Sequence, residues 1–564
     1  MRHLNIKLLW VLIVCIISSC STESTPVYVL TTSCEPTDAG TVSPANVQAK
    51  RGQSVTITAT PQTHWVFERW SGCYSGSQNP ANITMDNDKN ITAIFKKRDY
   101  PLTIHIEGEG TVQERVIQAK TTHYPHGALV ELTAVPNDGW SFAEWGGDIE
   151  SRDAVTQVTI SGETTIILTF KPLFYLHANG ITIMCPHSKA GDKGIINGVE
   201  YESVDGKLLI QRRNEGSDLS RVCVSLVYDM SGLFRYKNFN QQIGNWDVSN
   251  VTHMWGMFSY SPFNRPIGNW DVSNVTGMHS MFMGSSFNQP IGDWDVSNVT
   301  DMTQMFWESA FNQPIGDWNV GNVTNMRGMF YSSHFNQPIG NWDVSNVTDM
   351  DHMFDSSHRF NQPIGKWDVG NVTTMGAMFR FSSFDQPIGD WDVSNVKEMG
   401  EMFRGSAFNQ PIGNWDISNV QNVWMMFYFS SFNQPIGDWD VSNLTSMEAM
   451  FSFSQFNQPI GTWDVSNVTN MRGMFDRSHF NQKIGNWDVS SVTNMRSMFN
   501  ESPFNQPIGD WDVSNVRDMA YMFRYSPFNQ PINKWCVRLI LSEPFRFSTH
   551  LAQENKPVWG TCPD

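Results

Sequence analysis

The residues with the most regular potential for chemistry are carboxylates that recur about every 24 residues in the motif FNQPIGDWDVSNVTDM. The main series follows a tryptophan and comprises Asp247, Asp271, Asp295, Asp343, Asp368, Asp392, Asp416, Asp440, Asp464, Asp488 and Asp512, with Asn319 interrupting it. A second series, two positions earlier, adds Asp293, Asp317, Asp390, Asp438 and Asp510. Carboxylates stacked at strand spacing repel each other unless they are neutralised, so one interpretation is a stripe for Ca²⁺ or a basic ligand. The favoured interpretation is that each aspartate accepts hydrogen bonds from the Ser-Asn turn after it, because no calcium-loop motif such as DxDxDG occurs. We therefore predict no metal site.

Methionine recurs twice in every unit, as at Met254 and Met257. Thioethers bind soft metals, but this regular spacing favours packing in a core. The histidines are scattered, and there is no nucleophile elbow, phosphate-binding loop or HExxH motif. We therefore predict no catalytic residue, no enzyme activity and no cofactor.

Aromatic residues that change from one copy of the motif to the next are the best candidates for ligand binding, because exposed aromatics anchor protein interfaces. Five of them share one position, two residues after the Met-Phe pair. The candidates are Trp255, Tyr260, Trp307, Tyr331, Phe381, Trp424, Phe429, Phe453 and Tyr525. Partial burial against neighbouring units is the alternative. A varied surface suits an irregular protein partner, whereas a uniform surface suits a repeating polysaccharide or a purely structural stalk.

These residues belong to a unit that begins with phenylalanine and is copied along most of the chain. The first residues of the copies are Phe239, Phe263, Phe287, Phe311, Phe335, Phe360, Phe384, Phe408, Phe432, Phe456, Phe480, Phe504 and Phe528. One extra residue near Arg359 lengthens a single step to 25. A period of this length with retained apolar positions indicates a leucine-rich solenoid, in which each unit must stack on its neighbours to bury its apolar face.

Within one unit, the spacing Ile-x-x-Trp-x-Val predicts a short strand with Trp246 and Val248 pointing inward. Residues 245, 247 and 249 would then face outward on a concave sheet. The spacing Val-x-x-Met-x-x-Met-Phe predicts a short helical turn. The recurring Asn240 position is expected to satisfy backbone groups of adjacent coils.

Residues 27–97 and 99–172 are two copies of another pattern, with alternating segments typical of strands, such as VTITA and VELTA. Each copy carries W-x-F-x-x-W-x-G, which resembles the divergent internalin-type B repeat of bacterial surface proteins. The resemblance implies small β modules that act as spacers. Trp65, Trp70, Trp140 and Trp145 are expected to form their cores rather than a binding groove.

Residues 173–238 are predicted to form a bridge and an N-terminal cap. Asn179-Gly180 and Asn197-Gly198 indicate turns between short strands. Val227, Met230 and Phe234 repeat the spacing of the first full unit and predict a half-repeat, as a solenoid end requires.

The N-terminus reads as a targeting segment, with Arg2 and Lys7 before an apolar run that ends at Cys20. This ending resembles the lipobox of bacterial lipoproteins, in which Cys20 would carry the lipid; an ordinary secretory signal is the alternative. Cys15 lies within the signal segment. The other six cysteines fall into three pairs, each within one proposed unit, which favours disulfides over zinc without proving the pairing. These pairs are Cys34 with Cys73, Cys185 with Cys223, and Cys536 with Cys562.

The repeats, with the ending KPVWGTCP, resemble the BspA-like leucine-rich repeat surface proteins of bacteria. The resemblance implies an adhesive or ligand-binding role with a protein or polysaccharide partner. The formal charge of −17 argues against nucleic acid. We expect a monomer that contacts the membrane only through its lipid, on the surface of a bacterial outer membrane. The predicted fold is a mixed repeat protein, a leucine-rich-repeat solenoid preceded by two small β modules. Its parts are a signal peptide (1–19), a tether (20–26), the β modules (27–97 and 99–172), the bridge and cap (173–238), twelve repeats (239–534) and a C-terminal cap (535–564).

Overall fold

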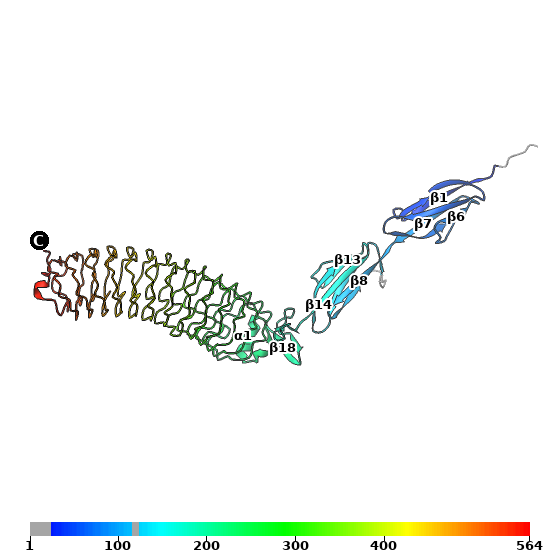
Figure 1. Ribbon diagram of the computed structural model, residues 1–564. Coiled ribbons are helices and arrows are strands. Elements are labelled where there is room, and N and C mark those ends of the chain that lie inside the picture. Colours follow the sequence, from blue (N-terminus) through cyan, green and yellow to red (C-terminus); the bar gives the residue numbers. More distant parts are fainter. Residues whose placement is uncertain (1–23, 116–122, 564) are drawn as a thin grey trace, which may run out of the picture. The chain divides into compact units, whose positions relative to one another are not determined.

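The structure is a computed structural model that describes residues 24–115 and 123–563 (Figure 1). It contains two compact units, Met1–Lys171 and Pro172–Asp564. The predicted signal peptide and the lipid-carrying Cys20 lie outside the described residues. Among the described residues, no helix has the length and apolar character needed to cross a membrane.

The first β module pairs two small sheets around a buried core. Its seven strands are β1 (Val27–Glu35), β2 (Gly40–Ser43), β3 (Asn46–Lys50), β4 (Ser54–Pro61), β5 (Trp65–Gly72), β6 (Ala81–Thr84) and β7 (Lys89–Lys97). One sheet has the order β3-β1-β7-β5 and the other the order β2-β4-β6, with β1 and β7 parallel. Leu30, Ile57 and Trp70 are fully buried in the core.

The second module repeats this topology. Its strands are β8 (Asp99–Glu107), β9 (Gly110–Arg115), β10 (His123–Pro125), β11 (Leu129–Pro136), β12 (Trp140–Gly147), β13 (Val155–Thr159) and β14 (Thr164–Pro172), in sheets ordered β10-β8-β14-β12 and β13-β11-β9. Trp145 is buried, and Trp65 and Trp140 pack against the cores of their modules. The tryptophans therefore serve as core residues, as predicted.

The expected disulfide between Cys34 and Cys73 is wrong, because both cysteines are free. Cys34 lies on β1, and Cys73 follows β5, while β7 lies between these two strands in the sheet. Two strand spacings amount to roughly 9.6 Å, which exceeds the reach of about 7 Å between the Cα atoms of a disulfide.

The bridge contains short strands and one helix. These elements are β15 (Tyr175–Leu176), β16 (Ile183–Met184), β17 (Lys193–Ile196), β18 (Val199–Ser203), α1 (Gly206–Glu215), the 3₁₀ helix η1 (Leu219–Arg221) and β19 (Val222–Cys223). A second 3₁₀ helix, η2 (Gln553–Asn555), lies in the C-terminal cap. Both predicted Asn-Gly turns connect paired strands, whereas helix α1 was not predicted. Asp205 caps its N-terminus by accepting from the Leu208 amide, and Gly216 ends it in a left-handed conformation.

Two of the three cysteine pairs are disulfides. Cys185 is bonded to Cys223 across the bridge, and Cys536 is bonded to Cys562 in the C-terminal cap. The predicted half-repeat joins the stack, since the Met230 and Phe234 amides donate to the carbonyls of His253 and Met257 in the first full unit.

Each repeat forms one coil of a stack (Figure 1), but the predicted strand and helical turn are wrong. In their place, the segment after Val251 alternates two kinds of backbone hydrogen bond. The Met254 and Phe258 amides donate to Gly277 and Met281 of the next coil, and the Met257 amide donates back to Met254 within the coil. Isolated parallel bridges such as His253–Gly277 continue this ladder from coil to coil.

The same segment places two residues per coil at positive φ, which the third position of a type II turn requires. In the first coil they are Gly256 (57°) and Tyr260 (53°). The second position is the one shared by five aromatic candidates, and Phe381, Phe429, Phe453 and Tyr525 also have positive φ. These aromatics therefore occupy a backbone conformation that non-glycine residues rarely adopt.

The coils are wider apart on one side of the stack than on the other. Parallel tryptophan rings of successive coils, such as Trp246 and Trp270 or Trp342 and Trp367, are 6.3 and 6.5 Å apart. The rings of Phe427 and Phe451, which follow methionine, are only 5.5 Å apart. The Met-Phe side is therefore concave, and residues 245, 247 and 249 lie on the wider tryptophan side rather than on the predicted concave sheet.

The core is the set of columns that the spacing predicted. Ile243, Trp246, Met254, Met257 and Phe258 are buried, as are their counterparts in every later full copy of the motif. The extra residue near Arg359 makes an additional turn at the corner, where the Phe360 amide donates to Ser357. The longer coil therefore keeps its core positions in register.

Candidate functional site

The aspartate series forms turns, as the favoured interpretation predicted. Asp343 Oδ1 accepts the Ser345 amide at 3.1 Å and its hydroxyl at 2.6 Å. The Ser345 hydroxyl is the main cause that holds the pKa of Asp343 below its ordinary value. Asn319 makes the equivalent bond to the Gly321 amide, so the position needs an acceptor rather than a charge. Among the described residues, no cluster of three or more His, Cys, Asp or Glu side chains could hold a metal ion.

The asparagine series connects the coils, as predicted. Asn264 Oδ1 accepts the Asn288 amide at 3.0 Å and Gln289 Nε2 at 3.0 Å from the next coil. Asp385, the one exception in the series, accepts the Asn409 amide and Gln410 Nε2 in the same way. Both series therefore act as scaffold.

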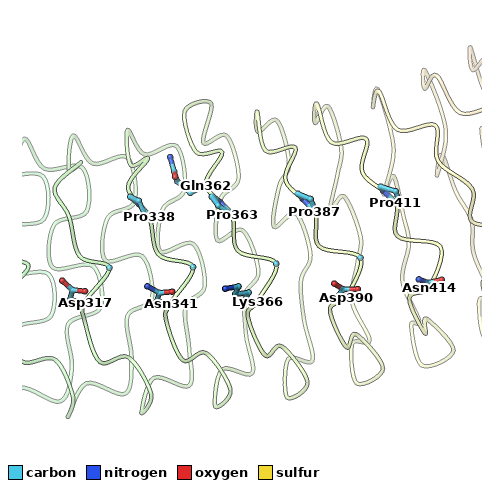
Figure 2. A pocket seen from close by; sticks show the side chains of 14 residues that line it. Asp317, Pro338, Asn341, Gln362, Pro363, Lys366, Pro387, Asp390, Pro411 and Asn414 are labelled. Carbon is cyan, nitrogen blue, oxygen red and sulfur yellow. The ribbon is translucent and has the colours of Figure 1, made fainter.

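The tryptophan side carries a shallow groove of about 870 Å³. Figure 2 shows its two edges, a row of prolines from Pro338 to Pro411 and a row of polar side chains from Asp317 to Asn414. The floor is glycine because a proline carbonyl of the next coil lies against it: a Cβ on Gly340 or Gly365 would lie 2.5 Å from that carbonyl. The proline edge and the glycine floor thus repeat from coil to coil, whereas the polar edge changes from Asp317 and Asn341 to Lys366.

The concave side carries the variable residues, and several of its aromatics are exposed. Phe429 exposes 64% of its surface, Tyr525 54% and Trp424 40%. Trp255, Tyr260 and Phe381 are also exposed, whereas Trp307, Tyr331 and Phe453 are half-buried. We call this surface the variable face; it consists of the side chains from the residue before the first methionine to the second residue after Met-Phe in each coil.

Most of these aromatics pack along the stack as well as facing outward. The Trp307 and Tyr331 rings stack at 3.6 Å, and Trp255 stacks on His279 at 5.6 Å. Tyr260 lies over Gly284, where an added Cβ would come within 2.4 Å of the ring. These aromatic rings are therefore partly buried against neighbouring coils and partly exposed to solvent, so the two interpretations of the aromatics do not exclude each other.

Arginines interleave with the aromatics, and the sequence analysis missed them. Arg404 lies 5.5 Å from the Phe381 ring and 5.1 Å from the Tyr428 ring, and Arg477 lies 4.9 Å from the Phe453 ring. Guanidinium groups at these distances are held by cation–π attraction. The signal was present, since most arginines of the repeats fall at the variable positions after the methionine or the Met-Phe pair.

A chain of ion pairs crosses the middle coils of the variable face. The fully buried carboxylate of Asp355 accepts His352 Nδ1 at 2.8 Å and Arg380 at 2.7 Å. Arg380 also contacts Glu401 at 2.7 Å, and Arg404 binds the other oxygen of Glu401. These arginines are neutralised within the protein, so this chain orders the face.

The ionised form is disfavoured in two further carboxylates of the variable face. Burial raises the pKa of Asp349 and of Asp476 above their ordinary values. Asp476 receives a hydrogen bond from Asn500 Nδ2 at 2.7 Å, which compensates in part. Asp349 Oδ1 accepts the Asp351 amide at 2.9 Å, so both carboxylates bond within the repeat stack.

The fold and this face define a stacked-repeat protein with paired β modules at its N-terminal end. The chain belongs to the family described as "Mycoplasma protein of unknown function, DUF285", whose model matches residues 208–310, 284–383, 307–406, 364–458 and 452–557. A second model, the "Divergent InlB B-repeat domain", matches residues 30–99 and 100–173. Neither the curated proteins nor the solved structures compared with the chain gave a match.

These matches bear out the predicted B-repeats and the repeat architecture. Both families are repeat families of surface-type proteins, which supports a surface-exposed or extracellular protein with a binding or structural role. Neither family is known for catalytic activity.

Proposed function

We propose that the protein is a non-catalytic surface protein that binds a protein partner on its variable face. The observation that carries this proposal is the coincidence of exposure and variation. Phe429, Trp424 and Tyr525 are exposed on the side of the stack where the coils differ most from each other. Aromatic residues and arginine are enriched in protein interfaces and supply most of their binding energy.

Some of the exposed aromatics are also well prepared for binding. The rings of Tyr260 and Phe381 rest on Gly284 and Gly405 of the next coil, so little side-chain freedom remains to be lost on association. An irregular surface of this kind discriminates between partners, which a uniform surface does not do. The β modules then act as spacers between the stack and the cell.

The second candidate is polysaccharide binding, which the regular groove of Figure 2 favours. A similar hollow recurs at Lys483, Pro507 and Asp510. Polar side chains at every coil would suit a repeating ligand, but no tryptophan, tyrosine or phenylalanine lines the groove between Gly316 and Asn414.

The two candidates separate in one experiment on the purified chain. The test measures binding to a panel of extracellular matrix proteins and to a glycan array. The face variant carries Phe381→Ala, Trp424→Ala and Phe429→Ala; the matched groove variant carries Pro338→Ala, Pro363→Ala and Pro387→Ala. We expect protein binding that falls at least about tenfold in the face variant only. Glycan binding lost only in the groove variant would overturn the proposal.

We also propose that Cys20 anchors the protein by a lipid on the outer membrane of the bacterial cell. The sequence support is the apolar run that ends in Ile17-Ser18-Ser19-Cys20. Labelling of cells with an alkyne fatty acid should mark the wild-type protein but not the Cys20→Ser variant. Equal labelling of both would reject the anchor, and accessibility of the repeats to protease on intact cells tests exposure.

A further inference from the structure

The last coils of the variable face carry a compact group of arginines and aromatic rings. We define the arginine–tyrosine cluster as Arg496, Tyr521, Arg524, Tyr525, Phe545 and Arg546. Arg496 lies 5.1 Å from the Tyr521 ring, Arg524 lies 4.4 Å from the Tyr525 ring, and Arg546 lies 5.2 Å from the Phe545 ring. Tyr521 and Phe545 meet edge to face at 5.3 Å. Three rings and three guanidiniums thus hold one another in place.

The backbone continues the ladder through this cluster, so its geometry is fixed by the stack. The Tyr521 amide donates to the Phe545 carbonyl at 3.1 Å, and the Tyr525 amide donates to Thr549 Oγ1 at 2.7 Å. Phe545 and Arg546 therefore belong to a last coil, although they lie beyond the final copy of the motif.

Two guanidiniums of the cluster differ from the other arginines of the face. Arg327 is paired with Asp351 at 3.0 Å, and Arg380 is paired with two carboxylates. Within the described part of the chain, Arg524 and Arg546 form no salt bridge with a carboxylate. Glu501 is close enough to attract Arg524, but its salt bridge is with Arg477 at 3.0 Å.

The neighbouring Tyr525 responds to the charge of Arg524. The bond of Arg524 to the Tyr525 hydroxyl is the main cause that lowers the pKa of Tyr525 below its ordinary value. Within the residues that the structure describes, Arg496 is the one arginine of the cluster that is paired with a carboxylate, Asp518 at 3.4 Å. The cluster is therefore locally cationic in a protein of formal charge −17.

The chemistry of the cluster defines what it can recognise. A guanidinium held over a ring can still offer N–H groups to a carboxylate, which it binds through two parallel hydrogen bonds. Two such groups, one coil apart and flanked by the exposed rings of Tyr525 and Phe545, fit a short segment that carries carboxylates beside apolar side chains. Nucleic acid requires many aligned cations, and the acidic remainder of the protein would repel it.

We propose that the arginine–tyrosine cluster is the docking site for an acidic polypeptide segment of the partner protein, with Arg524 and Arg546 binding its carboxylates. This inference rests on the proposed function and specifies the chemistry of the partner at one end of the variable face. Sulfated or other anionic polysaccharides are the competing occupants.

The test uses the full chain and two fluorescent peptides of about ten residues, one alternating Glu with Tyr and the other with Gln in place of Glu. Anisotropy measures their affinity for the wild-type protein and for the double variant Arg524→Gln, Arg546→Gln. The matched control is Arg327→Gln on the same face. Circular dichroism and the melting temperature establish that each variant is folded.

We expect the Glu peptide to bind about tenfold more tightly than the Gln peptide, and its binding to weaken as salt is added. The double variant should lose about tenfold in affinity for the Glu peptide, whereas Arg327→Gln should bind it like the wild type. Arg524→Lys keeps the charge but not the planar fork and should give an intermediate affinity.

Three results would overturn the inference: no binding of either peptide by the wild type, equal affinity for both peptides, or unchanged affinity in the folded double variant. Heparin that binds the cluster more tightly than the Glu peptide would assign it to anionic polysaccharide instead. The face variant Phe381→Ala, Trp424→Ala, Phe429→Ala leaves the cluster intact and should retain peptide binding. Failure of the proposed function and failure of this inference are therefore separate outcomes.

Discussion

Trp270 donates its indole Nε1–H to the carbonyl oxygen of Ile243, one coil earlier, over 3.1 Å. The same bond recurs through the stack, as far as Trp535 and Ile508 at 3.0 Å. It lies on the side where the stacked tryptophan rings of successive coils are more than 6 Å apart, farther than the phenylalanine rings on the Met-Phe side, where the backbone ladder runs. A long side chain with a donor at its far end spans this gap, and the asparagine side chains do the same at the corners.

Replacement of one such tryptophan should lower the stability by more than the loss of side-chain volume alone would. We expect Trp318→Phe to lower the free energy of unfolding by about 2–4 kcal/mol, since it leaves a cavity and the Ile291 carbonyl without its donor. Urea denaturation followed by circular dichroism measures the change. The exposed Trp424 is the matched control, and Trp424→Phe should stay within about 0.5 kcal/mol of the wild type. Equal effects at the two sites would contradict this account of the tryptophan column.

The asparagine series predicts that its side chains are needed as hydrogen-bond acceptors and that a negative charge at this position is tolerated. Asn288 Oδ1 accepts the Asn312 amide at 2.9 Å and Gln313 Nε2 at 3.1 Å. Asn288→Ala should cost about 1–2 kcal/mol because both donors lose their acceptor. Asn288→Asp keeps the acceptor and should cost little, as the natural Asp385 shows. The thermal unfolding of the two variants should therefore differ clearly, and similar losses would refute the role of Oδ1.

The positive φ angles predict that two glycines differ in how much stability is lost when each is replaced by alanine. Gly473 has φ +60° with open space around it, the nearest atom to an added Cβ being Asp476 Cβ at 3.8 Å. Gly473→Ala should cost about 1–2 kcal/mol through the backbone alone. Gly277 has equally open surroundings without a positive φ, so Gly277→Ala should be neutral or stabilise by up to about 1 kcal/mol. The two unfolding midpoints are compared under identical conditions.

Replacement of the buried Asp476 by asparagine should increase the stability by an amount that depends on pH. Because burial raises its folded pKa, the ionised side chain destabilises the folded state at neutral pH, and this penalty disappears below the ordinary pKa of 3.8, where both states are protonated. Asp476→Asn should raise the melting temperature at pH 7, with a gain that shrinks to zero in acid.

Asp343→Asn should change the stability at pH 7 in the opposite direction. The folded pKa of Asp343 is lowered, so its contribution is present above 3.8 and is lost as the pH falls through the folded value. This variant should be slightly less stable at pH 7 and equal to the wild type in acid. A stability difference that stayed constant with pH in either variant would contradict the pKa directions.

The sequence predicted the columns of the core but not the backbone that carries them. Val251, Met254, Met257 and Phe258 are spaced as on one face of a helix, and all are buried. Successive tight turns also return every third residue to the same side, so apolar spacing alone does not distinguish them from a helical turn. The curvature depends on which coil–coil contacts are backbone and which are side chain, and single-sequence spacing does not contain that information.

The prediction of the candidate site from the sequence was incomplete for a similar reason. The aromatics stood out because they vary within a constant motif, and the structure places them on one face. Arg380, Arg404 and Arg524 vary in the same way, but their importance lies in the rings and carboxylates that they contact in other coils. The Cys34 and Cys73 pairing failed because their proximity in the sequence pattern says nothing of the strand that separates them.

The Oδ1 bonds between Asn264, Asn288 and Asn312 use identical groups at every junction. A genetic duplication or deletion of one whole copy would therefore leave each remaining junction with the same partners, and unequal crossing-over could lengthen or shorten the stack without a folding penalty at the join. Each such event would also reorder the aromatics and arginines on the variable face. The scaffold thus makes changes of binding specificity accessible in single mutational steps.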